Sequence, residues 1–290
     1  MTITSLYLDD QAGNTLPLVP HPLITVTGIT MGFPEVRAVV EDRPDTDGTR
    51  DTTSLIGARA VSITAELYAT PATLADAWRA FMAPRKRCYL YCTDTEWAGI
   101  GSGTRRILLR ADQWSDPIMQ GADDVFRAVQ AQWRAPEGMW EDATATQVTI
   151  SAYAPSITGM NFPMKFPIAW TAGSPVTGTI ITNLGALPMH FTARLYGSCN
   201  GPSLISDTLG KQMTFLSTFA VAAGTYIELD TRERTANRLS SPADSQLANM
   251  DLVNTTWWQL QPGQNSIRFV PGSGVVAGSS ALITYRQTYL

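Results

Sequence analysis

The chain has 290 residues, of which 16% are charged, and its formal net charge is −4. This length accommodates two domains of ordinary size, and the 22 glycines and 18 prolines are typical of a β-rich chain with many turns. The negative balance supplies no broad positive field for phosphates, which argues against a nucleic-acid partner.

Alternating apolar and polar residues predict strands in the first 70 residues, at 3–8, 23–29 and 57–67. The third is the clearest, and its inward face carries Val61, Ile63 and Leu67. Between them, residues 41–53 are almost all polar and have no apolar period, so we expect a solvated loop there.

A single amphipathic helix follows. Thr70 is a suitable N-cap, Pro71 suits the first helical position, and Pro84 ends the pattern. The apolar positions that define the buried face of this helix are Leu74, Ala77, Trp78, Phe81 and Met82. We expect the helix to cover one end or face of a sheet.

Further strands are predicted at 87–92, 106–111 and 123–134, the first two joined by a hairpin loop with Gly99, Gly101 and Gly103. The last of these strands places Val125, Val129, Ala131 and Trp133 on one side. Successive antiparallel strands around one helix predict a small barrel or folded sheet. Residues 143–175 are nearly uncharged, and we place a domain boundary near residue 157.

The second half shows short strands separated by turns, which favours a β-sandwich or jelly roll. We expect them at 178–182, 188–196, 213–221, 225–230, 257–260, 266–270 and 281–290. Gln261-Pro262-Gly263-Gln264 has the residues of a type II turn. The sequence thus predicts an all-β protein with one short helix and two domains, 1–157 and 158–290.

Catalysis by a serine–histidine pair is not supported. The chain has two histidines and no G-x-S-x-G elbow. His21 lies between two prolines in a loop, and His190 falls on the polar side of a predicted strand, so we expect both to be exposed and inert. Neither serves a catalytic site in this interpretation.

Metal binding and cofactor binding are not supported either. Cys88 and Cys92 share the Leu90 face of a strand, and with Cys199 they are expected to be free, buried thiols. Asp45-Thr46-Asp47-Gly48 resembles part of a calcium loop, but Arg43 occupies the first ligand position. The glycines from Gly99 to Gly103 are not followed by a helix, so no phosphate loop is expected.

Carboxylate pairs occur at Asp123–Asp124 and Glu141–Asp142, where we expect strand edges and turns with solvated charge. A hydrolase that uses carboxylates alone stays open as an alternative. So does a carbohydrate-binding module in which Trp257 or Trp258 stacks on a sugar, although core packing of these rings is favoured. No signal peptide and no membrane span are expected.

The order of these features resembles that of the distal tail proteins of long non-contractile bacteriophage tails. Gly57-x-Arg59 opens the clearest strand, and the end of the chain carries IELDT at 227–231 and WQLQPGQNSI at 258–267. These segments are similar to that family's strand-Asp and W-x-L-x-P-G-x-N-x-I patterns. The uncharged segment 143–175 is longer than the family's linker.

The resemblance implies a split-barrel-like N-terminal domain that forms a ring of six copies and a galectin-like C-terminal sandwich. It further implies a non-enzymatic hub of the virion tail tip, assembled in the host cytoplasm. The partners it implies are the chain itself, the tail tube protein, the tape measure protein and the baseplate hub protein, with host-surface carbohydrate as a further option. The alternative assembly is a monomer that joins only its tail partners.

Overall fold

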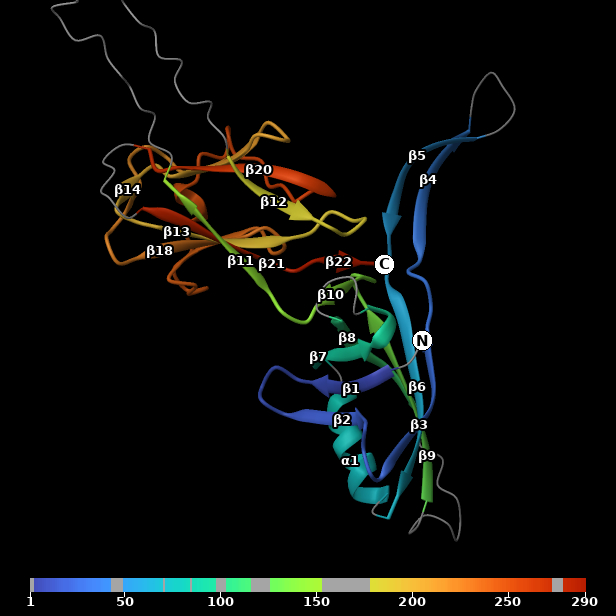
Figure 1. The fold of residues 1–290 in the computed structure, drawn as a ribbon. Helices are drawn as coiled ribbons and strands as arrows, with labels where there is room; N and C mark the ends of the chain where they lie inside the picture. The colour runs from blue at the N-terminus through green and yellow to red at the C-terminus, as the bar shows by residue number, and fades with distance from the viewer. Residues whose placement is uncertain are drawn as a thin grey trace, which may run out of the picture. The chain divides into compact units, whose positions relative to one another are not determined.

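The computed structural model describes residues 3–42, 49–69, 71–83, 85–97, 103–115, 126–152, 178–272 and 279–290. The chain divides into two compact units, Met1–Thr144 with Gln287–Leu290, and Ala145–Arg286. Strands make up most of both units (Figure 1), and α1 (Pro71–Phe81) is the one α-helix within the described ranges. The predicted all-β class with one short helix is therefore confirmed. No helix among the described residues is long and apolar enough to cross a membrane.

An antiparallel sheet in the order β2-β1-β7-β8-β9-β6-β3 forms the first unit. A short strand, β10, pairs with both β8 and β22. These strands are β1 (Ile3–Asp9), β2 (Thr15–Val19), β3 (Ile24–Met31), β6 (Arg59–Tyr68), β7 (Arg87–Asp94), β8 (Thr104–Ser115), β9 (Phe126–Ala135), β10 (Trp140–Asp142) and β22 (Thr288–Tyr289), and a 3-10 turn, η1 (Thr95–Trp97), follows β7.

The core of the first unit follows the predicted alternation. Side chains expected inward on β6 and β9 are fully or almost fully buried, namely Val61, Ile63, Leu67, Val129, Ala131 and Trp133. Helix α1 packs on β6 and β9 and buries Trp78 completely. Ala75 is buried and Ala77 is exposed, so the predicted helix face was wrong at Ala77, because the buried stripe runs through Ala75, Trp78 and Phe81. Thr70 and Pro84 lie outside the described residues.

Strands β4 (Val36–Asp42) and β5 (Thr49–Ile56) pair, within the described residues, with each other and with no further strand, and they form what we name the arm. The arm runs on from β3 and β6 (Figure 1), because backbone bonds such as Glu35 N–H to Ala58 O (3.0 Å) continue the ladder between them. The predicted loop at 41–53 was therefore wrong at 41–42 and 49–53. Residues 41–53 are almost all polar, so their sequence carries no apolar period that would predict these strands.

Two sheets facing a common core make up the second unit, in the orders β11-β21-β13-β18-β19 and β12-β20-β15-β16. The predicted sandwich is confirmed. Its strands are β11 (Thr146–Ser151), β12 (Thr179–Asn183), β13 (Phe191–Tyr196), β14 (Cys199–Asn200), β15 (Ser203–Ser206), β16 (Lys211–Thr214), β17 (Ala220–Val221), β18 (Tyr226–Asp230), β19 (Thr235–Arg238), β20 (Gly263–Val270) and β21 (Ser280–Tyr285), with a 3-10 turn η2 (Leu247–Asn249).

Two details of the C-terminal prediction need correction. Residues 281–290 are not one strand, because β21 ends at Tyr285 and β22 pairs with β10 in the first unit. Residues 257–260 form only an isolated bridge, from Leu260 to Met189. The compact units also divide at other positions than 157, since β11 pairs along β21. That 1–157 and 158–290 fold as separate domains stays a prediction.

Candidate functional site

The three cysteines are free and buried, as predicted. Burial raises the pKa of the Cys88 and Cys92 thiols to about 12 and that of Cys199 to about 11. A thiol that stays protonated is a poor nucleophile and a poor metal ligand. The described residues contain no group of three or more His, Cys, Asp or Glu that could hold a metal ion. Asp45, Asp47, Gly99, Gly101 and Asp123–Asp124 lie outside the described part of the chain.

The expectation that Glu141 and Asp142 are solvated was wrong, since both are more than nine-tenths buried. Strand β10 lies beside β8 in a register that sets Glu141 opposite Arg106 and Asp142 opposite Arg105. The Glu141 Oε2 atom lies 3.1 Å from Arg106 Nη2, and Asp142 Oδ2 accepts a bond from the Tyr289 hydroxyl at 3.5 Å. Each carboxylate is thus compensated within the sheet, which is a structural arrangement.

A polar hollow in the second unit is the candidate binding site, and we name it the Trp257 hollow. Its volume is about 360 Å³, which lies within the usual range of small-molecule sites. The hollow is lined by His190, Leu209, Lys211, Thr231, Arg234, Trp257, Trp258, Gln259 and Gln261. These residues come from loops and strand ends that are far apart in the sequence.

The Pro-Gly turn fixes one wall of the hollow. Gly263 has a φ of +89°, as the predicted type II turn requires. The fully buried Asn265 closes the turn, because its Oδ1 accepts the Gln261 N–H (2.9 Å) while its Nδ2 donates to the carbonyls of Gln261 (2.7 Å) and Gly263 (3.1 Å). The P-G-x-N pattern therefore positions Gln261, whose Nε2 donates to the Gln259 carbonyl at 3.3 Å.

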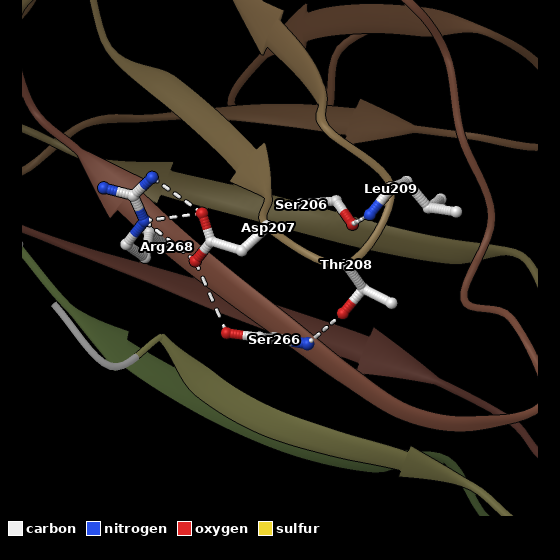
Figure 2. A network of polar contacts seen from close by, with 6 residues as sticks. All are labelled: Ser206, Asp207, Thr208, Leu209, Ser266 and Arg268. Carbon is white, nitrogen blue, oxygen red and sulfur yellow. Dashed lines mark hydrogen bonds and ion pairs between the residues drawn. The ribbon is translucent and has the colours of Figure 1, made fainter.

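A second wall is the turn between β15 and β16, which Figure 2 shows tied to β20. Arg268 holds Asp207 through Nη2 at 2.6 Å and through Nε at 2.8 Å. The Ser266 N–H donates to Thr208 Oγ1 at 2.9 Å, and the Leu209 N–H donates to Ser206 Oγ at 3.3 Å (Figure 2). These contacts hold the turn that brings Leu209 and Lys211 to the hollow.

His190 is half-buried rather than exposed, which corrects the sequence prediction. Its Nε2 lies 2.7 Å from Nε2 of the Gln259 amide, and its Nδ1 lies 3.5 Å from Thr231 Oγ1. Thr231 accepts the Phe191 N–H at 2.9 Å and donates to the Phe191 carbonyl at 2.8 Å. No local pattern pairs residues 190 and 259, so this contact has no signal in the sequence.

The two adjacent tryptophans have different roles. Trp258 is 3% exposed and packs on Phe191 with ring centroids 4.7 Å apart, as the favoured core interpretation predicted. Its indole Nε1–H has no hydrogen-bond partner among the described residues. Trp257 is only partly buried and lines the hollow. Of the two, Trp257 is therefore the ring that a ligand could contact.

In the first unit, large apolar side chains are exposed at the base of the arm. Phe33 is 90% exposed, Val36 65% and Leu55 50%. Beside Phe33 lies a shallow hollow of about 350 Å³, to which Glu35 and Arg134 also contribute. Exposed apolar groups gathered in this way mark interaction surfaces rather than catalytic sites.

The fold matches solved structures of phage proteins over the full chain. The SPP1 Dit protein (gp 19.1), described as a paradigm of the hub adsorption apparatus in phages that infect Gram-positive bacteria, is 12% identical with a TM-score of 0.64, and the match covers 100% of both chains. The two chains share a fold. The resemblance predicted from the sequence is thereby confirmed at the level of the fold.

Two structures of the phage P2 baseplate in its activated conformation match as well. The one with Ca is 12% identical with a TM-score of 0.58 and covers 99% of this chain and 98% of that chain. The one with Sr is 11% identical with a TM-score of 0.56 and covers 98% and 97%. No protein-family model and no curated protein sequence matches the chain.

Proposed function

We propose that this chain is a structural hub protein at the tip of a long non-contractile phage tail. The observation that carries the proposal is the fold match to the SPP1 Dit protein over the whole of both chains. The likeness to chains of a phage baseplate supports the same role. In this role the protein joins the tail tube to the baseplate, contacts the tail tube, tape measure and baseplate hub proteins, belongs to the virion and is assembled in the host cytoplasm. It has no catalytic function.

The hub assembles as a ring of six copies through the first unit. The arm supports this proposal, because an isolated two-stranded ribbon is marginally stable in water and offers unpaired edges. Phe33, Val36 and Leu55 expose apolar surface at its base. A ring needs two different complementary surfaces on each copy, and the arm and the opposite edge of the sheet supply them. A chain with only 16% charged residues also has little charge to keep copies apart.

Mass measurement across a concentration series tests the ring. The full chain is used, because residues Gln287–Leu290 belong to the first unit. Wild-type protein should self-associate as concentration rises. Phe33→Asp should shift the midpoint of this self-association to at least about tenfold higher protein concentration. Val253→Asp is the matched control, since Val253 is 93% exposed in the second unit, and it should behave as wild type.

Electron microscopy of native particles tests the hub role itself. An antibody against this chain should mark the junction between tail tube and tip. The hub proposal is refuted if the wild-type chain is strictly monomeric at every concentration and the particle contains no ring of this protein. Turnover of purified cell wall that a single Asp or Glu substitution abolishes would instead establish the hydrolase alternative.

A further inference from the structure

The Trp257 hollow combines features that the hub role does not use. Two cationic side chains, Lys211 and Arg234, line it together with the partly buried ring of Trp257, and no carboxylate of the described residues is among its lining groups. The chain as a whole is net negative, at −4, so this local positive charge is not part of a general basic surface. Because its volume is about 360 Å³, the hollow suits a small ligand or one unit of a polymer.

Both cations are exposed, and neither is paired with a carboxylate in the described part of the chain. Two carboxylates close to them in the sequence, Asp207 and Asp230, are engaged elsewhere. Asp207 is held by Arg268 (Figure 2), and the Asp230 carboxylate accepts the backbone N–H groups of Arg232 (2.7 Å) and Glu233 (3.1 Å). Lys211 and Arg234 are therefore available to an anion from solution.

The remaining lining groups suit a hydroxyl-rich ligand. Nε2 of Gln259 contacts His190 Nε2 (2.7 Å) and Nε2 of Gln261 donates to the Gln259 carbonyl (3.3 Å), so each amide keeps one donor proton and its acceptor oxygen for a ligand. The buried Asn265 holds the backbone of Gln261 in place. Trp257 adds an apolar plane of the kind that packs on the face of a pyranose.

We propose that the Trp257 hollow binds an anionic saccharide. The sugar ring packs on Trp257, its hydroxyls bond to Gln259 and Gln261, and its carboxylate or phosphate lies between Lys211 and Arg234. A nucleic acid fits less well, because two cations neutralise too few phosphates for useful affinity. The second unit would then contact a charged surface polysaccharide in addition to its place in the tail. This inference does not depend on ring formation.

Binding to the full chain in solution tests the proposal, with saturation-transfer NMR as the readout. The probes are a glucuronate-containing disaccharide, a glucose phosphodiester of glycerol, and neutral maltose. At least one of the two anionic saccharides should bind, with at least about tenfold higher affinity than maltose. Its binding should weaken as salt rises, because partly exposed charge pairs are screened. Which anionic saccharide binds identifies the source of the charge.

Variants separate the two parts of the site. Arg234→Gln and Lys211→Gln should each weaken anionic binding about tenfold and leave maltose unaffected, while Trp257→Ala should abolish saccharide binding. Arg87→Gln removes one exposed charge from the first unit and should change nothing. Circular dichroism verifies that each variant is folded, and the two glutamine variants carry the test if Trp257→Ala is not.

Several outcomes would overturn the inference. One is equal binding of maltose and the anionic saccharides, and another is no binding of either anionic probe at about 10 mM. Inorganic phosphate that binds as tightly as the phosphodiester would remove the role of the sugar ring. An acidic tetrapeptide that binds where the saccharides do not would assign the hollow to a protein partner instead.

Discussion

Removing the buried side chain of Asn265 should destabilise the second unit while leaving the first unaffected. The three bonds between the Asn265 side chain and the 261–263 turn are 2.7 to 3.1 Å long. Each net bond contributes about 1 kcal/mol. Since Gly263 is exposed, water recovers part of its carbonyl bond. The Asn265→Ala cost is therefore about 2–3 kcal/mol.

Hydrogen exchange followed by mass spectrometry reads the two units separately. A loss of this size should speed the slowest amides of β13 and β18 about 30- to 150-fold. Peptides from β1 and β7 serve as the internal control and should keep their rates. Asn254→Ala is the matched variant, because this exposed asparagine bonds only within its own turn, to Asp251. If Asn265→Ala changes the β13 and β18 rates less than about fivefold, the turn is not held by Asn265 and the reasoning is refuted.

Of three further predictions, the first and the last concern the first unit, and the one on the thiols concerns both units. The pKa of Asp10 is held well below its usual range, chiefly by the hydrogen bond from the Asn14 amide (2.8 Å). The ionised Asp10 therefore stabilises the fold above about pH 4, and this stabilisation is lost as pH falls. In thermal melts, the melting temperature of Asp10→Asn should fall less steeply with decreasing pH than that of wild type, and an equal slope would contradict this. Burial raises the pKa of the Cys88 thiol to about 12, so Ellman's reagent at pH 8 should find no reactive thiol in native protein and all 3 after unfolding. Trp78→Ala should cost about 3–5 kcal/mol in denaturant unfolding, against less than about 0.5 kcal/mol for the exposed Ala77→Ser.

Local pattern alone determined much of the secondary structure and the turn chemistry. Strict alternation at 57–67 identified the buried face of β6, since successive strand residues point to opposite sides. The Pro-Gly pair identified the turn at Gly263, because a positive φ there is accessible to glycine at little cost. The arm escaped prediction for the opposite reason. Residues 41–53 are almost all polar, so alternation gives no strand signal there.

Pairing between distant segments was decided only by the tertiary structure. Nothing near Thr288 in the sequence indicates that it pairs with Glu141. The predicted strand at 281–290 is therefore longer than β21, which ends at Tyr285. His190 was assigned to solvent because alternation says which side a residue faces but not which loop covers that side. Gln259, 69 positions away, covers it. The Trp257 hollow exists because Asn265 and Arg268 hold two separate turns against the same sandwich, and such convergence follows from packing rather than from local sequence.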